Sequence, residues 1–148
     1  MHRLTLWFTQ NAIHLLRISI GIIYVWFGAL KFFPNLSPAD QLARTTINLI
    51  TFGLIPDNVS IILLAIWETL LGLVLIAGLW RTFAFYVLLV HMVCTFVPLF
   101  FFTEVSFTNT PYAFTLVGQY IMKNLIIIWS ALLIHAHHKG TVIVRTLE

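Results

Sequence analysis

The sequence predicts an all-α membrane protein in which four transmembrane helices form one bundle. Of its 148 residues, 60% are hydrophobic and 9% are charged, and the mean hydropathy is +0.97. Soluble domains carry about 25% charged residues, so this chain lacks the polar surface that water requires. Four segments also reach the roughly 20 mainly apolar residues that a membrane-spanning helix needs. These observations together predict a single membrane domain over residues 1–148.

Each predicted span follows one apolar run. Lipid offers no hydrogen-bond partners to free backbone groups, so helix is the expected state of every run. The expected spans are residues 12–33, 59–79, 83–102 and 116–136. The first run is too long for the hydrophobic region of a signal peptide and is not followed by a small-residue cleavage site. We therefore expect it to stay in the membrane.

Between the first two spans, a shorter segment has the pattern of an amphipathic helix. Its apolar face is formed by Ala39, Leu42, Ala43, Thr46, Ile47 and Ile50. We expect Ser37 to cap this helix, with Pro38 and Asp40 in its first turn. It is predicted to lie on the extracytoplasmic membrane surface and to cover one end of the bundle. Asp57 or Asn58 is expected to cap the second span.

The other connections and the basic residues predict the topology. Residues 78–82 form a tight turn, whereas residues 103–115 are polar and contain Pro111, which indicates a loop. Basic residues concentrate on the cytoplasmic side of membrane proteins. The predicted cytoplasmic side, with both termini, carries Arg3, Arg17, Arg81, Lys139 and Arg145. The other side carries Lys31 and Arg44 together with Asp40, Asp57 and Glu104.

Several function classes are excluded or disfavoured by the residue inventory. Cys94 is the only cysteine, which excludes an intramolecular disulfide and a CxxC redox pair. The chain has no long basic run and no basic–aromatic patch, so we expect no nucleic-acid partner. Haem would need His14 and His135 as paired ligands and is disfavoured. We predict no metal at His135, His137 and His138, because no carboxylate or thiol accompanies them.

Ionisable side chains inside the spans are the candidates for function. A charge at the bilayer centre costs about 2.5–3.5 kcal/mol on an insertion scale, so each one needs a partner or a role. The candidates for ligand binding or proton relay are Glu68, Lys123, His91, Asn124, Lys31 and Tyr24. With a rise of ~1.5 Å per residue, Glu68, Lys123 and His91 lie at similar depths. We expect these three to meet, with Glu68 and Lys123 as an ion pair.

Small and polar residues recur on one face of each predicted span, which indicates the faces that point inward. On the first span the stripe is Arg17, Gly21, Tyr24, Gly28 and Lys31. The other stripes are Ala65, Glu68, Gly72 and Leu75; Leu88, His91, Thr95 and Pro98; and Tyr120, Lys123, Ile127 and Ser130. Glycines on such faces allow helices to approach closely. Lys31 ends its span, and its long stem can reach inward or extend outward.

These residues also carry a resemblance to a known family. Residues 17–34 resemble the first helix of DoxX-like membrane proteins. Glu68 with Gly72, followed by Gly78 and Arg81, resembles their second helix. Residues 91–98 and residues 118–125, which contain Lys123 and Asn124, resemble the YkgB/RclC-type branch of that family.

The resemblance implies a four-helix bundle in a bacterial inner membrane. The wider family includes subunits linked to quinone-dependent sulfur oxidation and to oxidative-stress defence. The branch is linked to resistance against reactive chlorine. No established catalytic motif carries over to this chain.

Three functions stay open at this stage, and the sequence does not decide whether the protein is an enzyme. The first is a quinone-linked or oxidative-stress-related redox accessory that supports a membrane oxidoreductase partner. The second is a small-solute or proton-coupled carrier, for which we expect a homo-oligomer because four helices are few for alternating access. The third is a non-catalytic scaffold whose buried charges only fix helix packing. A quinone is compatible with the polar cluster, and the cofactor is otherwise unassigned.

Overall fold

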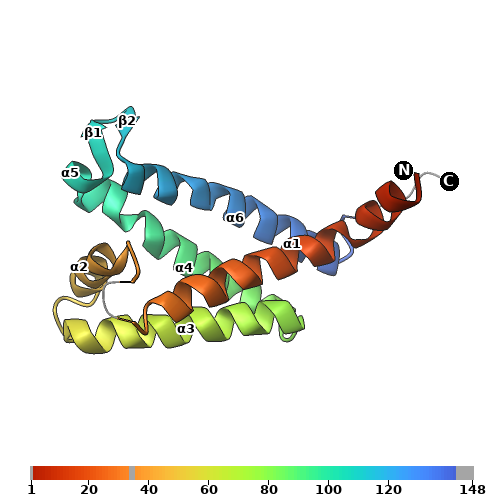
Figure 1. Ribbon diagram of the computed structural model, residues 1–148, viewed down its shortest axis with the longest axis horizontal. Coiled ribbons are helices and arrows are strands. Elements are labelled where there is room, and N and C mark those ends of the chain that lie inside the picture. The colour runs from red at the N-terminus through yellow and green to blue at the C-terminus, as the bar shows by residue number, and fades with distance from the viewer. Residues whose placement is uncertain (1, 34–35, 143–148) are drawn as a thin grey trace.

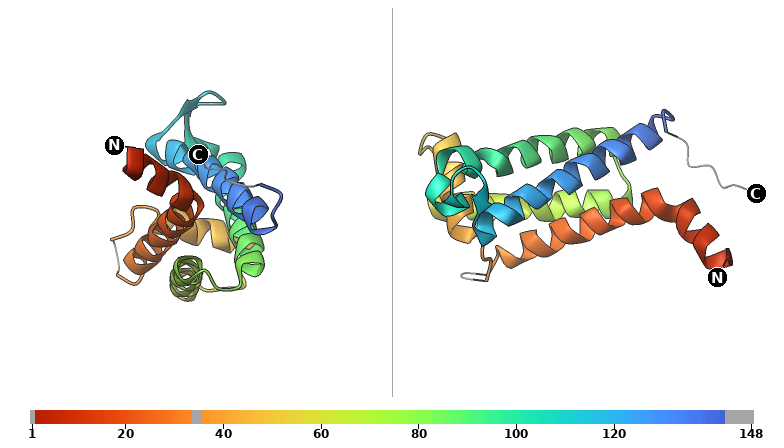
Figure 2. Two further views of the ribbon diagram at one scale, coloured as in Figure 1. Left: turned by 90° about the vertical axis from the view of Figure 1, so that its right-hand side faces the viewer. Right: turned by 90° about the horizontal axis from the view of Figure 1, so that it is seen from above.

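The computed structural model describes residues 2–33 and 36–142. Its long helices are α1 (His2–Leu30), α3 (Asp57–Ala77), α4 (Arg81–Phe101) and α6 (Leu116–His138). Each is long and apolar enough to cross a membrane. The four helices alternate in direction and form one bundle (Figures 1 and 2). The predicted all-α fold with four transmembrane helices is confirmed.

The short elements gather at one end of the bundle, which we call the loop end. They are α2 (Asp40–Ile50), α5 (Thr103–Ser106), and the antiparallel strands β1 (Phe107–Asn109) and β2 (Ala113–Phe114). At the opposite end, the α3–α4 turn at residues 78–80 lies near the end of α6 and alongside α1 (Figure 1). We call this the turn end. The four long helices connect the two ends.

Helix α1 differs most from its predicted span. It begins at His2 rather than at residue 12, and it ends at Leu30 rather than at residue 33. Polar residues in its first third interrupt the apolar run, but they bond within the helix. Thr9 Oγ1 donates to the Thr5 carbonyl at 2.9 Å, and Asn11 Nδ2 donates to the Trp7 carbonyl at 2.9 Å. The extra N-terminal segment projects beyond the turn end (Figure 2).

Helices α1 and α3 pack most closely, because glycines remove side chains from their contact. A Cβ on Gly21 would lie 2.8 Å from the Gly72 carbonyl oxygen, and a Cβ on Gly72 would lie 2.6 Å from the Val25 nitrogen. A Cβ on Gly28 would lie 2.7 Å from the Thr69 nitrogen. Any larger residue would push the two backbones apart. The predicted inward glycine stripes of these two helices are confirmed.

The apolar core lies between the four helices, and further large apolar side chains cover the outside. The core cluster consists of Ile20, Tyr24, Leu71, Leu75, Ala84, Phe85, Leu88, Met92 and Ala131. Outside it, Trp26 is 65% exposed and Trp129 is 69% exposed. Such an apolar exterior suits a lipid environment and not water.

Helix α2 is the predicted amphipathic helix, but its start differs from the expected cap. The residue before the helix is Ala39, which makes no side-chain cap hydrogen bond. The expected Ser37 cap is therefore wrong, and the buried Ser37 hydroxyl has no hydrogen-bond partner among the described residues. Asp40 does occupy the first turn, as predicted, whereas Pro38 precedes the helix and is not in its first turn.

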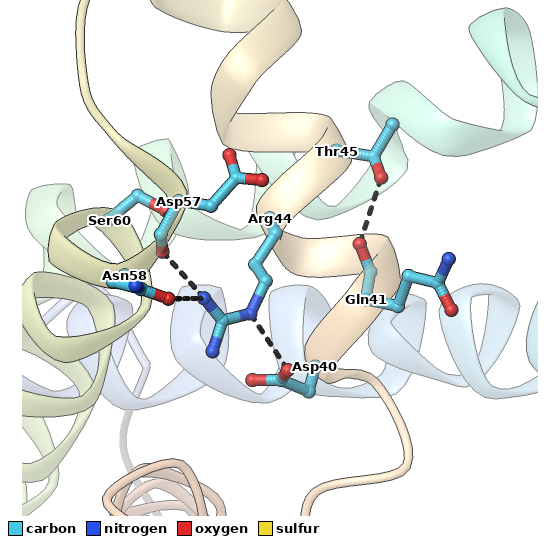
Figure 3. A network of polar contacts seen from close by, with 7 residues as sticks. All are labelled: Asp40, Gln41, Arg44, Thr45, Asp57, Asn58 and Ser60. Carbon is cyan, nitrogen blue, oxygen red and sulfur yellow. Dashed lines mark hydrogen bonds and ion pairs between the residues drawn. The ribbon is translucent and has the colours of Figure 1, made fainter. Parts of the chain in front are cut away.

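Arg44 fastens α2 to the start of α3 (Figure 3). Its Nε lies 2.8 Å from Asp40 Oδ2, one turn earlier in the helix. Its Nη1 donates to the Asp57 carbonyl at 2.8 Å and to Asn58 Oδ1 at 3.2 Å. Asp57 and Asn58 thus accept hydrogen bonds from Arg44. The prediction that one of them caps α3 is wrong, because the cap residue is Pro56.

Residues 103–115 are more ordered than the predicted loop. The side chain of Ser106 is fully buried, and its Oγ donates to the Pro98 carbonyl at 3.1 Å. Thr115 Oγ1 donates to the Val105 carbonyl at 2.6 Å and accepts from the Gly118 nitrogen at 3.1 Å. These bonds fold α5 and the β1–β2 hairpin onto the ends of α4 and α6. These elements have only two to four residues, which is too short for a hydrophobic period to show in the sequence.

Candidate functional site

A polar centre lies between α1, α3 and α4 and is built around Glu68. Glu68 lies near the middle of α3, while Lys31 directly follows the end of α1. A Cβ on Gly28 would meet Ala65 and Thr69, so the end of α1 is level with the middle of α3. The Lys31 side chain therefore reaches Glu68 from the adjacent helix.

The Glu68 carboxylate contacts a different nitrogen through each of its oxygens. Lys31 Nζ lies 2.5 Å from Glu68 Oε2, and His91 Nε2 lies 3.5 Å from Glu68 Oε1. The side chains of Lys31, Glu68 and His91 are 5%, 10% and 11% exposed. Lys31 Nζ also donates to the Phe27 carbonyl at 3.3 Å. One acidic and two basic groups from three elements thus share one buried position.

Tyr24 completes this group, which we call the Glu68 centre (Tyr24, Lys31, Glu68 and His91). The Tyr24 ring lies edge-on to the His91 ring, with 5.4 Å between their centroids. Tyr24 is 4% exposed, and its hydroxyl has no hydrogen-bond partner among the described residues. A buried polar group left without a partner costs about 1–3 kcal/mol. A bound water or a polar ligand atom would remove that cost.

The predicted Glu68–Lys123 ion pair is wrong. Lys123 is exposed on α6, and its Nζ lies 5.1 Å from the centroid of the Tyr120 ring. Its neighbour Asn124 faces the bundle instead, with Nδ2 donating to Thr95 Oγ1 at 3.2 Å. Successive residues on a helix are about 100° apart, so the orientation of Asn124 turns Lys123 outward. The predicted inward stripe that begins at Tyr120 is rotated for the same reason.

The structure thus brings together four of the six candidate residues. Tyr24, Lys31, Glu68 and His91 form the Glu68 centre, whereas Asn124 joins Thr95 and Lys123 lies outside. The centre holds a proton acceptor beside several N–H and O–H donors in an apolar setting. Such a group can bind a proton or the polar head of a small ligand.

A family comparison matches residues 12–103 to DoxX, which is well over half of the chain. The chain belongs to the DoxX family. The match includes every residue of the Glu68 centre in this DoxX protein, and it ends before α6. With its four apolar helices, this DoxX chain is a multi-pass membrane protein. No curated protein and no solved structure matches it.

The comparison leaves the predicted branch of the family untested. The resemblance of residues 118–125 to the YkgB/RclC-type branch falls outside the matched segment. Membership in that branch therefore stays a prediction.

Sequence reasoning missed the role of Arg17 at the turn end. Its Nη1 donates to the carbonyls of Leu75 and Ile76 in the last turn of α3. Gly78 ends α3 in the left-handed conformation, and a Cβ there would lie 2.7 Å from the Arg17 guanidinium. Arg17 thus satisfies the Ile76 carbonyl at the helix end and adds a second donor to the Leu75 carbonyl, which also accepts from the Gly78 nitrogen at 3.2 Å. The pattern of basic residues indicated its depth but not this partner.

Proposed function

We propose that this DoxX protein is a redox accessory of a membrane oxidoreductase and that the Glu68 centre binds the head group of a quinone. The observation that carries the proposal is the buried Glu68 carboxylate, which faces Lys31 on one oxygen and His91 on the other. Ionisable groups at this depth are costly and commonly functional. The affiliation with YkgB/RclC-type proteins and the link to oxidant stress belong to the same proposal.

The chemistry of the centre suits a quinone. Lys31 and His91 offer N–H groups, and Tyr24 offers an O–H group that has no acceptor within the described part of the chain. Quinone carbonyl oxygens accept hydrogen bonds from such groups. The side chains beside the centre are apolar, which is the setting that the ring of a quinone requires. Reduction to a quinol takes up electrons and protons together. In this proposal the partner oxidoreductase supplies two electrons, and water supplies two protons, which the Glu68 carboxylate takes up one at a time and passes to the quinone oxygens.

We propose that the protein lies in a bacterial inner membrane with both termini in the cytoplasm. The turn end carries Arg17 and Arg81, and the flanking ends of α1 and α6 carry Arg3 and Lys139. The loop end carries fewer basic residues, namely Lys31 and Arg44. This distribution follows the positive-inside rule. Arg145, which was part of the prediction, lies outside the described residues.

Quinone binding tests the proposal directly. Purified protein in lipid nanodiscs is titrated with a short-chain quinone while tryptophan fluorescence is recorded. Glu68→Gln keeps the shape of the side chain but removes the charge that holds the N–H donors of Lys31 and His91 in place. We therefore expect about tenfold weaker binding, which corresponds to about 1.4 kcal/mol. Glu104→Gln, which neutralises an exposed acid in α5, should bind like the wild type. A folded Glu68→Gln protein with wild-type affinity would contradict the proposal.

A scaffold role is the second candidate, and one observation favours it. Lys31 and Glu68 neutralise each other while joining α1 to α3, so the pair can serve packing alone. Lys31→Met combined with Glu68→Gln removes both charges. If cells with this double variant keep wild-type oxidant resistance, the charges serve structure only. Loss of resistance in a stably folded double variant would favour the redox role.

A further inference from the structure

A second polar region lies at the turn end, where two arginines from different helices line one cleft. Arg17 of α1 and Arg81 of α4 share this partly open cleft with His14 of α1 and with His137 and His138 of α6. The two guanidinium groups are near enough to repel each other. We call this region the Arg17–Arg81 cleft.

No acidic side chain lines the cleft among the residues that the structure describes. The five acidic residues of the chain are Asp40, Asp57, Glu68, Glu104 and Glu148. The first, second and fourth lie at the loop end, and Glu68 is paired with Lys31. Glu148 lies outside the described residues. The positive charge of the cleft therefore has no counterpart in the described part of the chain.

Each of the two arginines donates hydrogen bonds to described residues through only one of its three guanidinium nitrogens. Both hydrogen bonds of Arg17 leave from Nη1, so Nε and Nη2 have no acceptor within residues 2–33 and 36–142. Arg81 donates from Nε to the Gly78 carbonyl at 3.2 Å, and its two terminal nitrogens have no acceptor in the same ranges. Two fixed guanidinium groups with free N–H donors match the oxygens of a phosphate group.

We infer that the Arg17–Arg81 cleft binds a phosphate group, with His14, His137 and His138 offering further ring nitrogens. An anion of this class would offset the repulsion between the two arginines and accept their unused donors. The group can come from an anionic phospholipid or from free phosphate. The position favours a lipid, because basic pockets between transmembrane helices at the membrane boundary hold lipid head groups. This inference does not depend on the proposed role of the Glu68 centre.

Lipid binding measured by native mass spectrometry tests the inference. Purified full-length protein is released from nanodiscs of phosphatidylcholine doped with phosphatidylglycerol, and bound lipids are counted. Arg81→Gln spares the bonds of Arg17 to α3 and should bind phosphatidylglycerol about tenfold more weakly, as expected from one lost charge-assisted bond. Arg3→Gln removes an exposed arginine of α1 that does not line the cleft, and it should bind like the wild type. His137→Gln gives a second variant within the cleft and should show a smaller loss.

Competition with inorganic phosphate identifies the source of the bound group. Retention of phosphatidylglycerol in excess phosphate supports a lipid head group, and its displacement supports free phosphate in the same cleft. Equal losses for Arg81→Gln and Arg3→Gln would overturn the inference, because they would show only unspecific surface attraction. Equal binding of phosphatidylglycerol and phosphatidylcholine that Arg81→Gln leaves unchanged would also overturn it.

Discussion

The two polar regions of this bundle differ in whether their positive charges have an acidic partner within the described residues. In the Glu68 centre, the Lys31 ammonium lies 2.5 Å from a carboxylate, and both side chains are at least nine-tenths buried. In the Arg17–Arg81 cleft, two guanidinium groups lie together without an acidic neighbour among the described residues. The first charge is neutralised inside the protein, whereas the second requires an anion from its surroundings.

Position in the membrane explains the difference. A charge halfway along a transmembrane helix meets neither water nor lipid phosphate, so it must find its partner within the chain. A charge at the membrane boundary can take a partner from lipid head groups. Substitutions in the Glu68 centre should therefore act on stability first, and substitutions in the cleft should act on ligand binding first.

The largest effect on stability is expected from removing one member of the buried pair. Glu68→Gln leaves the Lys31 charge buried without its partner, which should lower the free energy of unfolding by about 3 kcal/mol. Reversible denaturation in mixed micelles measures this change. The exposed acid Glu104 supplies the control, since Glu104→Gln should change stability by less than about 0.5 kcal/mol. Equal stability of the two variants would show that Glu68 is not the main partner of the Lys31 charge.

An intermediate effect on stability is expected at the glycines in the contact between α1 and α3, which lies between the two polar regions. In Gly72→Val, the new Cβ would lie 2.6 Å from the Val25 nitrogen, so α1 and α3 must separate. Overpacking of this kind should cost about 2 kcal/mol. Leu73→Val, at a neighbouring position that is 50% exposed, should have little effect in the same denaturation assay. A tolerated Gly72→Val would contradict the close α1–α3 contact.

The smallest effect on stability is expected in the cleft, where the two arginines should differ. Arg17→Gln loses the bonds to the Leu75 and Ile76 carbonyls and should cost about 1 kcal/mol. Arg81→Gln loses one bond at an exposed site and should cost less than about 0.5 kcal/mol.

Added phosphatidylglycerol should raise the melting temperature of the wild type more than that of Arg81→Gln, because a ligand stabilises the form that binds it. An equal rise in the two proteins would show that the cleft does not bind the lipid.

Hydrophobic runs predicted the four long helices well, because length and apolarity decide whether a helix can cross a membrane. The start of α1 was missed, since Thr5, Thr9 and Asn11 lower the local hydropathy although they bond within the helix. The hairpin at residues 107–114 was missed because its strands are too short to show a period.

The candidate site was predicted only in part, because depth along a helix does not fix rotation about its axis. Lys31 and Lys123 were both within reach of Glu68 by depth. The glycine stripe of α1 aims Lys31 at Glu68, whereas the Asn124–Thr95 bond aims Asn124 at α4 and leaves Lys123 outside. The unused donors of Arg17 and Arg81 could not be predicted, since they depend on how the end of α3 packs between the two arginines.

Double-mutant cycles on Glu68 test the central claim most directly. One cycle combines Glu68→Gln with Lys31→Met, and the other combines it with Lys123→Met, each measured as the free energy of unfolding in the same micelles. We predict a coupling energy of about 2 kcal/mol for Glu68 with Lys31 and nearly none for Glu68 with Lys123. Coupling to Lys123 without coupling to Lys31 would contradict the arrangement of the Glu68 centre.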